Sequence, residues 1–139
     1  MTGYLLDTNV ISELTRDAPD PQVVSFLWNH EDVWLPAVLI HEVEYGLRLL
    51  PQGQRRDRIA EMQSAILSAY EDRILPLDRV GAEWTAEFRA QARLAERTID
   101  LGDVLIAGTA KAHDLAVATR NVVHFVGLDV DVVNPWDPL

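Results

Sequence analysis

The stretch Leu5-Leu6-Asp7-Thr8-Asn9-Val10 decides how this chain folds, because an apolar strand stops there at a single carboxylate. Residues 4–6 form a short apolar run, and the three polar residues after them are types that close turns by bonding their own backbone. Ligand sites in open α/β sheets lie at the carboxyl ends of strands. Asp7 is therefore either a ligand-binding acid or a plain helix N-cap.

Further apolar runs recur along the chain, and helical patterns separate them. The predicted strands are Gly3–Leu6, Val33–Leu35, Ile74–Leu77, Leu115–Ala118 and Val130–Val133. Strands that alternate with helices predict an α/β fold with a mainly parallel sheet. No repeat, low-complexity segment or linker divides residues 1–139, so we expect a single domain.

Capping residues and apolar spacing predict the helices between these strands. Asp20-Pro21 is an N-cap followed by proline, and it opens a helix that ends near His30. A second helix is expected from about Ala37 to Leu50, and a third over residues 53–73. A following helix has its apolar stripe at positions 80, 84 and 88.

Composition limits the classes of function. The chain has no cysteine, which excludes disulfides, thiolate metal sites and cysteine nucleophiles and favours a reducing compartment such as the cytoplasm. We expect no membrane association, since no apolar run approaches the ~20 residues that cross a bilayer. A net charge of −10 opposes general attraction to nucleic acid unless a basic patch or a bound cation reverses the sign locally.

Glu42 is an acid on an apolar helix face. Its neighbours three and four residues away are Val38, Leu39, Tyr45 and Gly46, all uncharged. A carboxylate in such surroundings either becomes protonated or finds a cation, which could be a metal ion or an arginine from another helix. Glu44 differs, because Arg48 four residues later predicts an exposed ion pair.

Asp100 and Asp103 begin a helix that is rich in small residues. Their spacing puts both on one face, where Asp100 can be the N-cap and Asp103 a first-turn acid that the helix dipole favours. Taken with Asp7 and Glu42, Asp103 can also be a metal ligand. Each of these acids would lie at the end of a strand or at the start of a helix above the sheet. Three converging acids need a cation.

Oxygen ligands without cysteine or paired histidines suit Mg²⁺ or Mn²⁺. Such an ion can activate water and neutralise charge on a phosphodiester, so phosphodiester hydrolysis is the natural reaction. Thr119, Arg120 and Asn121 follow a short apolar strand and could reach the same sheet edge, although an ordinary turn explains them equally well. The four histidines show no ligand spacing, with His124 a possible exception by position.

Arg89, Arg93 and Arg97 repeat every four residues, which predicts one helix face with few nearby acids. This face is either solvated or a contact for RNA phosphates or a protein partner. A second group at residues 55–58 is weaker, because acids partly offset it. Apolar candidates for a subunit interface are the tryptophans at 28, 34 and 136, whose simpler explanation is core packing.

The chain as a whole resembles the PIN-domain ribonucleases, and more narrowly the VapC/FitB-like toxins of type II toxin–antitoxin systems. The resemblance rests on the order and spacing of Leu6–Glu13, Glu42–Gly46, Asp103–Ala110, Ala118–Asn121 and Asn134–Trp136. It implies a three-layer α/β/α sandwich with a five-stranded sheet. It also implies a Mg²⁺- or Mn²⁺-dependent endoribonuclease, a VapB-like antitoxin that blocks the site, and a homodimer or a dimer of heterodimers.

The resemblance assigns roles to particular residues. Asp7, Glu42 and Asp103 match the family's acidic metal site, and Thr8 matches a polar position that helps to orient it; Thr119 is a further supporting residue. The family often carries a fourth acid where this chain has Asn121, which we retain among the candidate catalytic residues. Loss of that charge should weaken a second metal more than the first, so we expect one bound metal ion.

Four other functions compete with this interpretation. A haloacid-dehalogenase-type phosphotransferase would carry a second acid where this chain has Asn9, and a receiver domain would need paired acids near its start. The serious alternative is a non-catalytic PIN-fold module that binds RNA or protein, made plausible by Asn121 and His124. A nuclease that cuts DNA is a further possibility.

Overall fold

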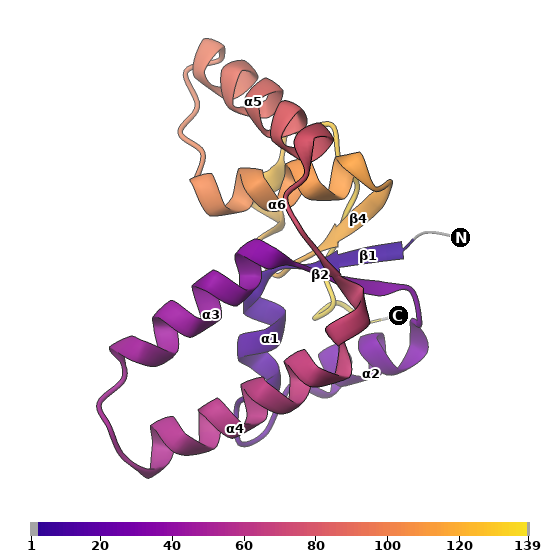
Figure 1. Cartoon of the computed structure of the whole chain (residues 1–139). Helices are drawn as coiled ribbons and strands as arrows, with labels where there is room; N and C mark the ends of the chain where they lie inside the picture. Colours follow the sequence, from indigo (N-terminus) through magenta and orange to yellow (C-terminus); the bar gives the residue numbers. More distant parts are fainter. Residues whose placement is uncertain (1–2, 139) are drawn as a thin grey trace.

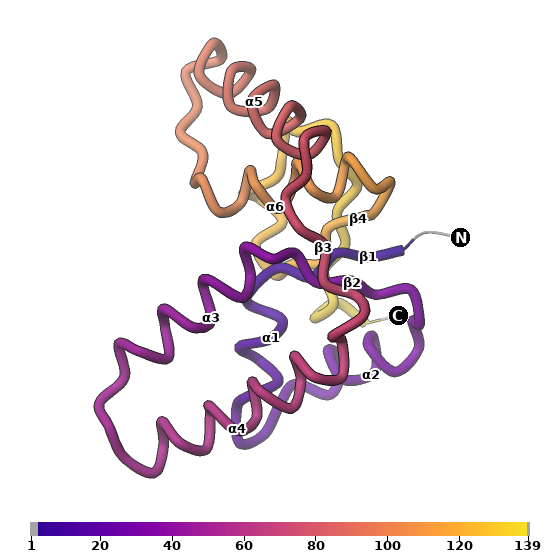
Figure 2. The backbone as a smooth tube through the Cα atoms, in the orientation of Figure 1, coloured from indigo at the N-terminus to yellow at the C-terminus, as the bar shows by residue number. Residues whose placement is uncertain are grey.

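The computed structural model describes residues 3–138 and shows a sheet between two layers of helices (Figures 1 and 2). The strands pair in parallel in the order β3-β2-β1-β4-β5. They are β1 (Gly3–Leu6), β2 (Val33–Pro36), β3 (Ile74–Leu75), β4 (Leu115–Ala118) and β5 (Val132–Val133). The predicted α/β fold with a five-stranded parallel sheet is confirmed, and β1 lies at the centre of that sheet.

The helices divide between the two faces of the sheet, with α1 to α4 on one side and α5 and α6 on the other (Figure 1). Two short 3-10 turns, η1 (Glu71–Arg73) and η2 (Val122–Phe125), complete the connections. The α-helices are α1 (Thr8–Leu14), α2 (Pro21–Asn29), α3 (Ala37–Leu49), α4 (Gln54–Ala69), α5 (Arg79–Leu94) and α6 (Leu101–Ala112).

The two faces of β1 belong to separate hydrophobic clusters, because successive side chains of a strand point to opposite sides. Leu5 packs in one cluster with Phe88 of α5 and Val104 of α6. Leu6 packs in the other with Val10 of α1 and Leu39 of α3. Apolar side chains thus cover both faces of the sheet, as the predicted three-layer α/β/α sandwich requires.

Several elements are shorter than the sequence pattern indicates. Strand β3 stops at Leu75, because Pro76 has no N–H to donate to a neighbouring strand. Strand β5 contains only Val132 and Val133, because a turn bond from the Val130 N–H to the Leu128 carbonyl precedes it. The single helix predicted over residues 53–73 is α4 followed by η1.

The end of α5 overturns the prediction that three arginines share one helix face. Helix α5 stops at Leu94, and Glu96 has a φ of 56°, a left-handed conformation. The Glu96 N–H bonds to the Arg93 carbonyl at 3.0 Å and the Arg97 N–H to the Ala92 carbonyl at 2.8 Å, which is a Schellman cap. Arg97 therefore lies beyond the helix, whereas Arg89 and Arg93 remain on it.

The tryptophans at 28, 34 and 136 differ in their surroundings. Core packing is wrong for Trp28, whose side chain on α2 is 87% exposed. It holds for the other two, since Trp34 and Trp136 pack partly buried against the hydrophobic clusters. Within the part of the chain that the structure describes, no helix is long and apolar enough to cross a membrane.

Candidate active site and metal centre

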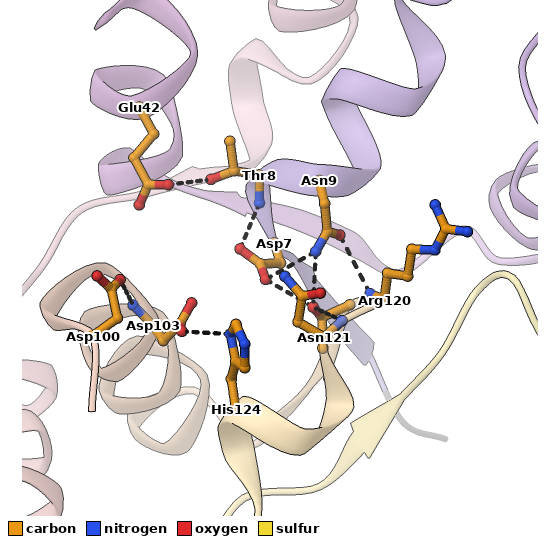
Figure 3. A network of polar contacts seen from close by, with 10 residues as sticks. Asp7, Thr8, Asn9, Glu42, Asp100, Asp103, Arg120, Asn121 and His124 are labelled. Atoms are coloured by element: carbon orange, nitrogen blue, oxygen red, sulfur yellow. Dashed lines mark hydrogen bonds and ion pairs between the residues drawn. The ribbon is translucent and has the colours of Figure 1, made fainter. Parts of the chain in front are cut away.

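The site is built around Asp7, which follows the central strand β1 and caps α1. Its Oδ1 accepts a hydrogen bond from the Thr8 backbone N–H at 2.7 Å, and its Oδ2 accepts one from the Thr119 hydroxyl at 2.8 Å. The Asp7 side chain is buried. These two bonds, from the ends of β1 and β4, hold the carboxylate at the carboxyl edge of the sheet (Figure 3).

The Thr119 hydroxyl is saturated with hydrogen bonds, which determines its direction. Besides donating to Asp7, its Oγ1 accepts from the Asn9 side-chain amide at 3.1 Å and from the Asn121 backbone N–H at 3.0 Å. A hydroxyl has one proton to donate and two lone pairs, so its only proton is directed to Asp7. The sequence pattern indicates only a turn at Asn9, because its partner Thr119 lies 110 positions later.

Glu42 reaches the site from the first turns of α3, the helix that follows β2. The Thr8 hydroxyl donates to its Oε2 at 2.9 Å, so Thr8 links Glu42 to the end of β1. Among the described residues, the partner of Glu42 is this hydroxyl and not the arginine considered from the sequence. Glu44 behaves as predicted and pairs with Arg48 at 3.4 Å on the surface.

Asp103 reaches the site from the first turn of α6. Asp100 caps this helix, since its Oδ2 accepts from the Asp103 backbone N–H at 3.1 Å. His124 of η2 places its Nδ1 3.0 Å from Oδ2 of Asp103. The other Asp103 oxygen points toward the space that Asp7 and Glu42 also face (Figure 3).

The surroundings of these acids raise their pKa values and so disfavour their ionised forms in the absence of a bound cation. Burial raises the pKa of Asp7, and the hydrogen bonds from Thr119 and Thr8 only partly oppose this. Burial also raises the pKa of Glu42 and that of Asp103, and the charges of Asp7 and Asp100 raise both further. A cation among these carboxylates would favour their ionised forms.

The donor chemistry of the site fits a hard divalent cation, because every acid in it offers carboxylate oxygens. As the side chains stand within residues 3–138, no group of three or more histidine, aspartate or glutamate residues has metal-holding geometry. Asp7 is fixed by hydrogen bonds, whereas Glu42 is held through one bond and Asp103 contacts one histidine. The latter two are therefore the side chains that can adjust.

Of the remaining candidate residues, Asn121 lies beside the acids and the three arginines do not contact them. Asn121 follows Thr119 and its side chain appears beside Asp7 in Figure 3. Arg97 donates to the backbone carbonyl of Val126. Arg89 and Arg93 are exposed on the second half of α5, before the loop that leads to α6.

The arginines at 55–58 are partly occupied by other parts of the chain. Arg58 pairs with Asp17, and Arg56 donates to the Leu50 carbonyl at 3.3 Å. These internal bonds agree with the prediction that this group is a weaker candidate than Arg89 and Arg93 for contact with RNA or a partner.

Comparison with known proteins identifies the family. The family model described as PIN domain matches residues 4–125, a range that contains all of the acids described above. The chain belongs to the PIN domain family. The resemblance predicted from the motifs is confirmed, and PIN nucleases generally use divalent metal ions, in agreement with the oxygen-only donors of this site.

Relatives of this PIN domain match it over nearly the whole chain. Toxin FitB of Neisseria gonorrhoeae is 42% identical over 135 residues, which are 95% of this chain and 97% of FitB. VapC ribonuclease Y4jK of Sinorhizobium fredii is 36% identical over 96% of this chain and 98% of its own. The crystal structure of FitAcB from Neisseria gonorrhoeae superposes with a TM-score of 0.88 at 40% identity, covering 97% of this chain and 99% of the other.

Proposed function

We propose that this chain is the toxin of a toxin–antitoxin pair, a metal-dependent endoribonuclease that hydrolyses RNA phosphodiesters. The observation that carries the proposal is the meeting of Asp7, Glu42 and Asp103, from β1, α3 and α6, at the carboxyl edge of the sheet in a PIN domain. Relatives over nearly the full chain are named a toxin and a VapC ribonuclease.

Mg²⁺ or Mn²⁺ is the cofactor that we assign to these three carboxylates. When bound, the ion would lower the pKa of a water molecule and neutralise charge on the phosphodiester. Asp7 is the most rigid of the three acids, because its two oxygens accept hydrogen bonds from Thr8 and Thr119. The Thr8 hydroxyl orients Glu42 and His124 contacts Asp103, so each acid has a neighbour that limits its rotation.

We infer a single metal ion. Between Thr119 and Phe125 the chain has no acid, and Asn121 stands where a carboxylate would add charge on that side. Asn121 offers a neutral amide, which suits a hydrogen bond to a water molecule or a phosphate oxygen more than a second divalent ion.

A VapB-like antitoxin is the protein partner that we infer, within a homodimer or a dimer of heterodimers. The relative of known structure is named FitAcB, and FitB is named a toxin. A group of buried and half-buried carboxylates at the edge of the sheet, on a chain of net charge −10, would attract a basic segment, whose arginine could pair with the acids and occupy the site.

One observation favours a second candidate function, a non-catalytic PIN module that binds RNA or protein. Asn121 lies beside Asp7 where the family often has an acid, and one carboxylate oxygen of Asp103 is in contact with His124. Such a module would keep the fold and the binding surface without cutting RNA.

Cleavage of a structured RNA separates the two functions. We expect the purified chain to cut RNA with Mg²⁺ or Mn²⁺ present and to lose this activity with EDTA. Asp7→Asn should reduce cleavage by about 10²-fold or more, because it removes the charge of the most rigid ligand and keeps a similar shape. A single-stranded DNA of matched sequence tests for a DNA nuclease.

The matched control is Asp20→Asn, which changes another helix-capping aspartate that bonds the Gln22 backbone N–H at 2.8 Å. It should cut RNA like the unchanged chain. Equal cleavage by Asp7→Asn and the unchanged chain would reject the site, and no cleavage by either, with RNA still bound, would favour the binding module.

A further inference from the structure

Asp100 is a fourth acid at the edge of the site, although its evident role is to cap α6. Its side chain is exposed, and one of its oxygens accepts the Asp103 backbone N–H. In Figure 3 its carboxylate lies beside Asp103 and on the same side of the site as Glu42. The cap bond uses Oδ2 and leaves Oδ1 available.

Gly102 shows how closely two of these acids approach each other. A Cβ atom built at Gly102 would lie 2.6 Å from Oε1 of Glu42 and 3.0 Å from Oδ2 of Asp100. The first contact is shorter than real Cβ atoms show and the second is at the tight limit, so a side chain at residue 102 would push against the ends of both carboxylate side chains. Glu42 and Asp100 thus meet at the first turn of α6, from different elements.

The charge of Asp100 reaches all three proposed metal ligands. Burial is the largest cause of the raised pKa of Asp7, of Glu42 and of Asp103, and the charge of Asp100 raises each of them further. An exposed helix cap could have been serine, threonine or asparagine, which cap equally well and would not add this repulsion. Asp100 therefore adds to this edge of the site a negative charge that a neutral cap would not add.

The opposite side of the site lacks such an acid. From Thr119 to Phe125 the ionisable residues are Arg120 and His124, and His124 contacts Asp103. The negative charge of the site is consequently concentrated at α3 and the start of α6.

We propose that Asp100 is the fourth carboxylate of this metal site, in addition to capping α6. The proposal rests on the metal-dependent function proposed above. Asp100 contributes its negative charge at the α6 side, and the missing side chain at Gly102 lets that charge lie next to Glu42. Affinity for a divalent ion rises with the number of ligand charges, so Asp100 tightens the binding of the single ion.

Asp100→Asn separates the charge from the cap, since asparagine caps a helix about as well as aspartate. We expect calorimetric or EPR titration with Mn²⁺ to show a dissociation constant about tenfold higher than that of the unchanged chain. The thermal midpoint of the metal-free variant should stay close to that of the unchanged chain, because asparagine keeps the cap. Asp100→Ser, a second neutral cap, should behave in the same way.

Two controls define the outcome. Asp20→Asn makes the same change at the cap of α2 and should leave Mn²⁺ affinity unchanged, whereas Asp7→Asn should abolish it. Asn121→Asp added to Asp100→Asn should recover part of the affinity, because a charge returns from the opposite side.

The proposal is overturned if both neutral caps bind Mn²⁺ as tightly as the unchanged chain while Asp7→Asn does not bind. In that case Asp100 is only a cap and the proposed function stands. If the unchanged chain itself fails to bind Mn²⁺, both proposals are rejected.

Discussion

Asp7 shows that a capping residue and a candidate ligand can be the same side chain. The sequence presents these as alternatives, yet Asp7 caps α1 through Thr8 and also faces the other acids. A carboxylate has about four lone-pair sites. Thr8 and Thr119 donate to two of them, and the Asn9 side-chain amide adds a longer bond of 3.4 Å to Oδ2, which still leaves Oδ1 with a free lone pair. The cap therefore positions the acid without consuming its capacity to bind a cation.

Residue-level prediction from the sequence succeeds where chemistry is local. The apolar neighbours of Glu42 indicate a shielded acid, and its raised pKa agrees with this. The bonds that join Asn9, Thr119 and Asp7 could not be predicted, because they connect chain segments that only the folded sheet brings together. For the same reason the sequence does not identify the partner of Glu42, which is the Thr8 hydroxyl.

Glu13 provides a prediction about pH and stability. It is a buried acid on α1 that accepts the Asp20 backbone N–H at 2.9 Å and pairs with Arg16 at 3.2 Å. Burial alone would raise its pKa, but these bonds outweigh burial and the pKa is lowered from its ordinary value. A lowered folded-state pKa means that Glu13 stabilises the fold above the unfolded-state pKa and ceases to do so as pH falls through the folded-state pKa.

Glu13→Gln should therefore lower the free energy of unfolding by about 1–3 kcal/mol near pH 7, since a buried charged acceptor is lost. The difference from the unchanged chain should shrink as pH falls below the ordinary value of 4.5. Urea unfolding at a series of pH values measures both quantities. A difference that stays constant down to pH 3 would show that the charge of Glu13 is not the stabilising feature.

At the scale of elements, helix starts are easier to predict than helix ends. Asp20 and Asp100 cap α2 and α6 as their sequence context indicates, and each accepts a backbone N–H from the first turn. The end of α5 was missed because its left-handed residue is Glu96, whereas glycine is the usual signal for such an end. Tertiary contact supports this end, since Arg97 bonds to the Val126 carbonyl from the adjoining segment.

This correction sharpens the proposal for RNA contact by α5. Arg89 and Arg93 are exposed one turn apart on the helix, and Arg97 is held elsewhere. If the first two contact phosphates, Arg89→Gln with Arg93→Gln should weaken RNA binding at all sequences. The slope of log affinity against log salt should fall by about 1 for each arginine removed.

Arg97→Gln is the matched control, because it removes the same charge from the chain at a position bonded to backbone. Fluorescence anisotropy with a catalytically impaired Asp7→Asn background measures binding without cleavage. Salt slopes that are the same for the double variant and the control would show that α5 makes no specific phosphate contact.

At the scale of the whole molecule, parallel pairing explains how acids distant in sequence become neighbours. Every strand of the sheet runs in the same direction, so β1, β2 and β4 all end at one edge. Asp7 follows β1, α3 with Glu42 follows β2, and Thr119 follows β4. Alternating strand and helix patterns suffice to predict the parallel sheet, but the strand order depends on long-range pairing that no local pattern contains.

Because the molecule is strongly negative, binding of the proposed metal ion should raise its stability. The chain carries −10 overall, and its buried or half-buried acids repel one another at the site. An ion that binds only the folded state stabilises it by mass action, by about 2.7 kcal/mol at a free concentration 100 times the dissociation constant. For a domain of this size the thermal midpoint should rise on the order of 10 °C.

Differential scanning calorimetry with Mn²⁺ or Mg²⁺ tests this expectation, with NaCl of equal ionic strength as the control for screening. Asp7→Asn should lose the rise caused by the divalent ion and keep the response to NaCl, because it alters the site and leaves the remaining surface charge in place. If NaCl raises the midpoint as much as Mn²⁺ does, general screening of the −10 chain accounts for the stabilisation. A rise specific to divalent ions and dependent on Asp7 requires that the folded chain bind the ion where β1 ends.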